Sequence, residues 1–181
     1  MIQVFKPFLG EEEIDAVAEV LRSGWIGTGP KTDKLEKEFA KFVKSPHALA
    51  VNSATAALNL VMAAFLKPGD EVITPSFTFI SSTHSIALAN ATPIFVDIDP
   101  DTLTLDPRDV VRNITRKTRG ILAIHYGGQS ANLKELKKIA RDKKLFLFED
   151  CAHANGTYYY DKHVGSTSDA GIFSFAAIKN M

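Results

Sequence analysis

Cysteine is nearly absent from the sequence, because Cys151 is the single one among 181 residues. No disulfide can form within the chain, which excludes a small secreted protein held by disulfides and favours a reducing compartment. Long apolar runs are absent too: the longest, at residues 54–66, contains Thr55 and Asn59 and is shorter than the ~20 residues that cross a bilayer. The first residues, MIQVFKPFLGEEE, lack the basic and apolar regions of a signal peptide. We therefore expect a cytoplasmic protein with no membrane partner.

An excess of charge of either sign is also missing. Lys and Arg together number 21, and so do Asp and Glu, which leaves a net charge of +0. Because no net positive field attracts a phosphate backbone, a nucleic-acid partner is not expected. Hydrophobic residues make up 45% and charged residues 23% of the chain, as in a soluble globular protein. The length fits one domain of ordinary size or part of a larger one.

Apolar residues recur with helical spacing in the first part of the chain. Residues 11–24 carry one apolar stripe, which predicts an amphipathic helix that ends at Gly24. Residues 32–44 repeat the pattern, and Thr32 is a suitable cap for that helix.

Farther along, short apolar runs alternate with helical segments. The runs are typical of strands buried on both faces, and they are ALAVN (48–52), EVIT (71–74), PIFVDI (93–98), GILAIH (120–125) and LFLFED (145–150). The helical segments between them lie at 54–66, 79–90, 107–114 and 131–144. This alternation predicts a mostly parallel sheet covered by helices on both sides, a three-layer α/β/α fold. No internal repeat or linker interrupts the pattern, so we expect one continuous domain.

In such a sheet, ligands bind beyond the carboxyl ends of the strands, in the loops that lead to the next helices. The candidate segments are those that follow each run, namely 52–55, 75–79, 125–128, 150–153 and the stretch up to Lys179.

The first of these loops carries Ser53, Ala54 and Thr55 at the start of a predicted helix. Exposed N–H groups, the helix dipole and two hydroxyls at such a place suit a phosphate. Simple capping of the helix by Ser53 explains the same residues, so both interpretations stay open.

Two ionisable residues follow the last predicted strand. Asp150 could keep a pyridine nitrogen protonated, or it could cap a helix or form a salt bridge, as the neighbouring Glu149 could. His153 could donate a hydrogen bond to a cofactor oxygen, or it could be a structural histidine. The residue types alone do not decide between these roles.

Metal binding is not expected. Cys151 and His153 offer two ligands at most, without the paired spacing of a zinc site. The acidic run FVDIDPDT has the aspartate spacing of a calcium loop, but Thr102 and Arg108 stand where that loop needs Gly and Glu.

An aromatic residue and a lysine complete the set of candidates. Phe79 could stack on a flat ring or belong to the core. Lys179 follows the strand-like FSF, and Ser174 lies five residues before it. A lysine that is desolvated in a site can lose its proton and form a Schiff base with an aldehyde.

Taken together, these stretches resemble the sugar aminotransferases of the DegT/DnrJ/EryC1/StrS family, which are pyridoxal-phosphate enzymes of the aspartate aminotransferase fold. The matching stretches follow the family's order over nearly the whole chain: SGWIGTGPKTDKLEKEFAKF, NSATAALNL, GDEVITPSFTFISS, ATPIFVDIDPDTLTLDP, HYGG, FEDCAHANGTYYYDKHVGS and FSFAAIKNM. The EDCAHA, FSF and IKN portions are most similar to the branch that makes 4-amino-4-deoxy-arabinose on a UDP carrier.

The resemblance implies a role for each candidate residue. Lys179 would form a Schiff base with pyridoxal phosphate and then move a proton between substrate and cofactor. Asp150 would pair with the pyridine nitrogen, His153 would lie near the 3-oxygen of the ring, and Phe79 would stack on the ring face. The residues implied to hold the phosphate are Ala54, Thr55 and Ser174, and those implied to approach the nucleotide-sugar substrate are Trp25, Ile26, Gly27 and Thr28.

The implied reaction is a ping-pong transfer in the synthesis of a surface polysaccharide or an amino sugar. An amino donor, expected to be glutamate, converts the cofactor to its amine form, and the amine then passes to the keto carbon of a nucleotide-linked sugar. Lysine at position 179 favours transamination, because the relatives that remove a hydroxyl carry His there.

Members of the family are about twice as long as this chain. They continue after the lysine with further strands and a small C-terminal domain, and they build each site at a homodimer interface. We therefore expect residues 1–181 to be the N-terminal part of the large domain, as a truncated or split-gene fragment whose partner is a second copy or the missing half. A sheet without its last strands exposes an unpaired edge, so we expect the chain alone to be unstable or poorly active.

Overall fold

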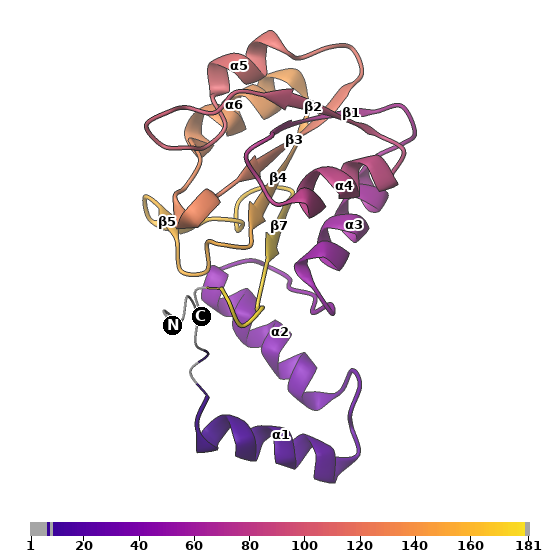
Figure 1. The fold of residues 1–181 in the computed structure, drawn as a ribbon, viewed down its shortest axis with the longest axis vertical. Coiled ribbons are helices and arrows are strands. Elements are labelled where there is room, and N and C mark those ends of the chain that lie inside the picture. Colours follow the sequence, from indigo (N-terminus) through magenta and orange to yellow (C-terminus); the bar gives the residue numbers. More distant parts are fainter. Residues whose placement is uncertain (1–6, 8, 180–181) are drawn as a thin grey trace, which may run out of the picture. The chain divides into compact units, whose positions relative to one another are not determined.

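The computed structural model describes residue 7 and residues 9–179. They form two compact units, whose elements are labelled in Figure 1. The first unit holds the described residues up to 50 together with 176–178, and the second holds 51–175 together with Lys179. None of the helices in the described ranges is long and apolar enough to span a bilayer.

The first unit contains two amphipathic helices, α1 (Glu11–Ser23) and α2 (Pro30–Val43). As predicted, α1 ends at Gly24, whose φ of 72° is the left-handed conformation that glycine adopts without strain. The predicted cap of α2 at Thr32 is wrong, because the helix already begins at Pro30. Proline suits this first position, since its fixed φ is helical and an N–H there would have no partner in the helix.

The predicted strand at residues 48–52 is also wrong. These residues form no strand, and Leu49 and Val51 have 77% and 37% of their surface exposed. A strand is held by hydrogen bonds to a neighbouring strand, and in the described part of the chain none pairs with residues 48–52. The run has the composition of a buried strand but lacks the partner that would bury it.

The second unit is built on a five-stranded sheet with the strand order β2-β1-β3-β4-β7 (Figure 1). Its strands are β1 (Glu71–Pro75), β2 (Thr92–Val96), β3 (Thr118–Ile124), β4 (Phe146–Cys151) and β7 (Ala170–Phe173). Every pairing between these strands is parallel. The other four predicted strands are therefore confirmed, and parallel pairing of β1, β2, β3 and β4 follows because a helix connects each of these strands to the next in the chain.

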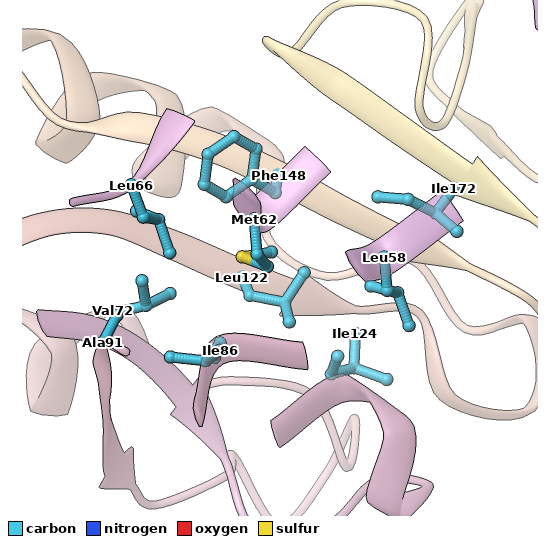
Figure 2. Close-up of a cluster of buried hydrophobic side chains, with 10 residues drawn as sticks. All are labelled: Leu58, Met62, Leu66, Val72, Ile86, Ala91, Leu122, Ile124, Phe148 and Ile172. Atoms are coloured by element: carbon cyan, nitrogen blue, oxygen red, sulfur yellow. The ribbon is translucent and has the colours of Figure 1, made fainter. Parts of the chain in front are cut away.

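Helices cover both faces of the sheet, which confirms the three-layer α/β/α fold. On one face lie α3 (Ala54–Phe65) and α4 (Ile80–Leu88), and on the other lie α5 (Pro107–Arg112) and α6 (Leu133–Lys143) (Figure 1). Figure 2 shows the core of the first face, formed by Leu58, Met62, Leu66, Val72, Ile86, Ala91, Leu122, Ile124, Phe148 and Ile172. The core of the second face contains Ile73, Val96, Leu105, Val110, Ile121, Ala123, Ala131, Leu136, Ala140 and Leu147.

Strand alternation decides where the acidic residues of β4 lie. Successive side chains of a strand point to opposite faces of the sheet. In β4, Phe148 belongs to the core of the α3/α4 face and Leu147 to that of the α5/α6 face. Asp150 therefore lies on the α3/α4 face and Glu149 on the α5/α6 face, so the two adjacent carboxylates have different surroundings.

Between β4 and β7 the chain forms an antiparallel hairpin of β5 (Tyr158–Tyr159) and β6 (Lys162–His163), which the sequence pattern did not predict. Each strand has only 2 residues, too few to show an alternation. Leu133, Cys151, Ala154 and Val164 form a small separate core in this region. A short 3₁₀ helix, η1 (Tyr126–Gly128), follows β3.

Candidate functional site

Asp150 lies at the end of β4 and is only 7% exposed. Its Oδ2 accepts a hydrogen bond from the Ser82 hydroxyl at 2.7 Å, and its Oδ1 accepts one from the Ala152 N–H at 3.1 Å. Both donors are uncharged. Because a carboxylate can accept about four hydrogen bonds, each oxygen keeps the capacity for a further donor.

His153 lies in the turn that follows β4. Its Nδ1 accepts a hydrogen bond from the Gly127 N–H at 3.3 Å, and its ring lies edge-on to Tyr126 with the centroids 5.5 Å apart. Burial and the nearby charge of Lys179 lower the pKa of His153, while Asp150 opposes this shift. The imidazole is therefore neutral at neutral pH, and its Nε2 carries the proton that it can donate.

Lys179 is half-buried, and its charge acts on His153. These two residues and Asp150 come from β4, the turn after it and the stretch after β7, and β4 and β7 are neighbours in the sheet. The strand order thus brings the three predicted residues to one carboxyl edge. Ser174 follows β7 at this edge, where it is buried and its carbonyl oxygen accepts a hydrogen bond from Asn155 Nδ2 at 2.9 Å.

The predicted phosphate-binding segment forms the N-terminus of α3. Ser53 caps the helix, because its hydroxyl oxygen accepts a hydrogen bond from the Ala56 N–H at 3.1 Å. Capping leaves further N–H groups for a ligand, because those of Ala54 and Thr55 belong to the first turn and have no partner within the helix. The side chain of Thr55 is exposed.

Phe79 directly precedes α4 and is 69% exposed. Of the two alternatives, membership of the core is therefore excluded, and the ring is exposed enough to stack on a ligand. The sequence analysis did not identify an aromatic pair near this edge of the sheet. The rings of Phe77 and Tyr126 pack with centroids 4.1 Å apart at an interplanar angle of 39°. Their positions could have indicated the pair, because the two residues follow the neighbouring strands β1 and β3.

The predicted substrate loop, Trp25–Thr28, belongs to the first unit and connects α1 to α2. Trp25 and Ile26 are 61% and 76% exposed. Trp25 lines a hollow of about 250 Å³, which Lys31 and Glu19 also line. These two side chains form an ion pair at 2.7 Å. An aromatic surface beside charged groups is suited to a polar ligand with a flat or apolar face.

A buried polar pair lies on the opposite face of the sheet, and sequence reasoning did not anticipate it. His125 Nε2 and Glu149 Oε2 are 2.8 Å apart, and both side chains are 0% exposed. The Ala131 N–H donates to His125 Nδ1 at 3.0 Å, so the imidazole proton is on Nε2 and is donated to Glu149. The Gly165 N–H donates to the same carboxylate oxygen at 2.8 Å. The available signal was that both residues lie close to the carboxyl ends of buried strands that pair with each other.

The donor atoms of His125, Glu149 and Cys151 lie within 4.8 Å of one another, as in a metal site. Burial, together with the negative charges of Glu149 and Asp150, raises the pKa of the Cys151 thiol well above its usual value. The thiol therefore stays protonated, and its Sγ donates to the Glu149 carbonyl oxygen at 3.7 Å. Both imidazole nitrogens of His125 are already engaged. Hydrogen bonding accounts for this cluster.

The ionisation of Glu149 predicts a loss of stability in acid. Burial would raise the pKa of Glu149, but hydrogen bonds from His125, from the Ser168 side chain and from the Gly165 amide hold it below the ordinary value of 4.5. A group with a lowered pKa stabilises the fold fully above its ordinary pKa, and this contribution is lost as the pH falls through the folded value. We expect the free energy of unfolding, measured with urea, to decrease below about pH 4.5.

Glu149→Gln separates this contribution from those of other acids. Hydrogen bonds from Arg108 and from the Asp97 amide also lower the pKa values of Asp106 and Asp109, respectively. These groups titrate equally in the wild type and in Glu149→Gln, so the difference between the two proteins reports Glu149. As the pH falls, the difference in the free energy of unfolding between the two proteins should shrink. The total decrease should be about 1.4 kcal/mol for each unit by which folding lowers the pKa of Glu149. An acid dependence that is identical in both proteins would contradict the assignment.

Comparison with known proteins places this geometry in a family context. The profile of the DegT/DnrJ/EryC1/StrS aminotransferase family matches residues 7–181. The spore coat polysaccharide biosynthesis protein SpsC of Bacillus subtilis (strain 168) is 47% identical over 176 residues, which are 97% of this chain and 45% of SpsC.

Solved structures are similar over the same extent. The sugar aminotransferase Spr1654 of Streptococcus pneumoniae, in its PLP form, superimposes with a TM-score of 0.96 and 36% identity, over 99% of this chain and 50% of Spr1654. DesI, solved in the presence of its TDP-sugar product, gives a TM-score of 0.88 and 35% identity, over 96% of this chain and 44% of DesI. The chain thus spans about half the length of these relatives.

Proposed function

The chain belongs to the DegT/DnrJ/EryC1/StrS aminotransferase family, and from this premise we propose that it forms the cofactor-binding part of an enzyme that transfers an amino group to a nucleotide-linked keto sugar. The proposed cofactor is pyridoxal phosphate, a choice supported by Spr1654, whose structures include a PLP form and a PMP form. In this proposal residues 1–181 are the N-terminal part of the large domain of that enzyme.

One observation carries the proposal: a buried carboxylate, a neutral imidazole and a half-buried lysine lie at one carboxyl edge of a parallel sheet. The spare acceptor capacity of Asp150 fits the N–H of a pyridinium ring. The free N–H groups at the start of α3 fit a phosphate, and the exposed ring of Phe79 fits a flat heterocycle. The residues present therefore fit pyridoxal phosphate.

Pyridoxal phosphate supplies an aldehyde and an electron-withdrawing ring, which makes a hydrogen on the carbon next to a bound amine acidic. Lys179 would hold the cofactor through Nζ. As a free amine, Nζ would accept a proton and return it during the transfer.

Asp150 would keep the ring nitrogen protonated by accepting its hydrogen. His153 would donate its Nε2–H to the 3-oxygen of the ring, a role that needs the neutral imidazole described above. Phe79 would stack on the ring and keep water from it. The proposed phosphate ligands are Ala54, Thr55 and Ser174.

The proposed substrate is a 4-keto sugar on a nucleotide carrier, and the proposed amino donor is glutamate. The name of SpsC and the TDP-sugar product of DesI support this class of substrate. The proposed contact for the substrate is the exposed loop Trp25–Thr28 beside its hollow. We also propose a homodimer as the working form, with the function in the synthesis of a surface polysaccharide or amino sugar in the cytoplasm.

A spectroscopic experiment tests the function. Pyridoxal phosphate added to the purified chain should produce a visible absorption band, because a Schiff base with a lysine is coloured. Glutamate should convert this band to that of the amine form, and a UDP- or TDP-linked 4-keto sugar should restore it. Mass spectrometry of the nucleotide product should show an added amino group.

The outcomes separate the alternatives. A folded, soluble sample that gives no band contradicts the proposed cofactor site. A product that has lost a hydroxyl without gaining an amino group contradicts transamination. A band without turnover supports the alternative that this chain is a fragment without independent catalytic activity.

A further inference from the structure

The buried hydrogen bond between Ser82 and Asp150 joins two elements that are 68 positions apart in the chain. Ser82 is 0% exposed on α4, and its Oγ lies 2.7 Å from Asp150 Oδ2. An ionised carboxylate only accepts hydrogen bonds, so the single hydroxyl proton of Ser82 points at Asp150. The direction of this hydrogen bond is therefore fixed.

This direction also fixes the next hydrogen bond. Thr78 Oγ1 and Ser82 Oγ are 2.9 Å apart, a distance at which either hydroxyl could donate. Ser82 has already used its proton on Asp150, so Thr78 must be the donor and Ser82 the acceptor. The three side chains form a directed chain of hydrogen bonds from Thr78 through Ser82 to Asp150, which we call the hydroxyl relay.

We propose that Ser82 is a positioning residue of the cofactor site, which acts through the hydroxyl relay to hold the Asp150 carboxylate in the orientation that meets the ring nitrogen of the cofactor. This inference rests on the proposed function. With Ser82 on Oδ2 and the Ala152 N–H on Oδ1, both oxygens are held and the carboxylate cannot rotate freely. A group held in the productive geometry before the ligand arrives binds it without first losing side-chain freedom.

The relay also connects Asp150 to the loop that carries Phe79. Thr78 directly precedes Phe79, and the Ser82 N–H donates to the Phe79 carbonyl oxygen at 3.1 Å. Ser82 thus holds the loop through its backbone and Asp150 through its side chain. Ser82 therefore contacts both Asp150, proposed to meet the ring nitrogen, and Phe79, proposed to cover the ring face.

Ser85 provides a matched control on the same helix. It is 1% exposed, like Ser82 a buried serine of α4, but its hydroxyl donates to the Ser82 carbonyl oxygen at 2.9 Å and not to Asp150. Ser82→Ala and Ser85→Ala therefore each remove one buried hydroxyl from the same helix. Only the first removes a hydrogen bond to the carboxylate.

The experiment is a titration of each purified variant with pyridoxal phosphate, followed by the visible absorption band. We expect Ser82→Ala to weaken binding about tenfold, because a hydrogen bond to a charged group contributes on this scale. Ser85→Ala should bind within about twofold of the wild type, and Ser82→Thr, which restores the hydroxyl, should do the same. The pH at which the band of the bound cofactor changes should shift in Ser82→Ala alone.

Thermal unfolding by circular dichroism shows whether each variant is folded. If Ser82→Ala does not fold, Thr78→Val tests the relay instead, since it removes the first donor and leaves Ser82 in place; we expect about threefold weaker binding. Equal affinity and an equal pH profile for Ser82→Ala and Ser85→Ala, or no effect of Thr78→Val, would overturn the inference. A wild type that binds no cofactor refutes the proposed function itself, which is a different result.

Discussion

Lys179→Ala abolishes the covalent attachment of pyridoxal phosphate to the chain. In the proposed site the Nζ of Lys179 is the amine that bonds to the cofactor aldehyde, and reduction with borohydride makes such a Schiff base permanent. After this treatment the wild-type chain gains the mass of the reduced cofactor on the peptide that contains Lys179. The variant gains none, although the other groups of the site remain and the cofactor can still bind without a covalent bond. Peptide mass spectrometry measures the difference.

Lys137 is the matched control for this prediction. Burial and the nearby charge of Lys162 lower the pKa of Lys137, while Glu149 opposes the shift. A lowered pKa makes an amine more reactive towards an aldehyde, so unspecific labelling would select Lys137. We expect Lys137→Ala to keep the full label at Lys179. Label that is divided among several lysines in the wild type, or that disappears in Lys137→Ala, would contradict the assignment of Lys179.

The sheet was predictable because most of its strands are apolar along their length and its central strands are buried on both faces. The runs that became β1, β2, β3 and β4 are apolar along their length, and helical segments separate them, so the parallel arrangement followed. The strand expected at 48–52 has the same composition but no partner in the described part of the chain. The hairpin of β5 and β6 escaped detection for the opposite reason, since a pair of hydrogen-bonded strands this short leaves no periodicity.

The site was predictable in part for the same reason. In a parallel sheet the residues after each strand gather at one edge, so Asp150, His153 and Lys179 could be grouped before their geometry was known. Ser82 could not be grouped with them, because it lies inside a helix and only the packing of α4 against the sheet brings it to Asp150. His125 was missed because strand alternation turns it towards Glu149, on the face away from Asp150.

His125→Ala is expected to destabilise the second unit by about 1.5–3 kcal/mol, the usual contribution of a hydrogen bond to a charged group. Glu149 is 0% exposed, and the variant would lose the hydrogen bond from His125 to Oε2 while keeping the one from the Gly165 amide. The Ala131 N–H would lose its acceptor as well. Urea unfolding followed by circular dichroism at neutral pH measures the loss.

A second variant tells whether the unpaired charge or the lost volume is responsible. His125→Ala/Glu149→Gln removes the charge but keeps an amide oxygen that can accept from Gly165. If the charge dominates, the double variant should be more stable than His125→Ala by about 1–3 kcal/mol, the range of coupling between residues in contact. If the cavity dominates, the two variants should be equally unstable, because both lack the imidazole. Recovery in the double variant would mean that the hydrogen bond from His125 is what allows β4 to carry a second, buried carboxylate directly beside Asp150.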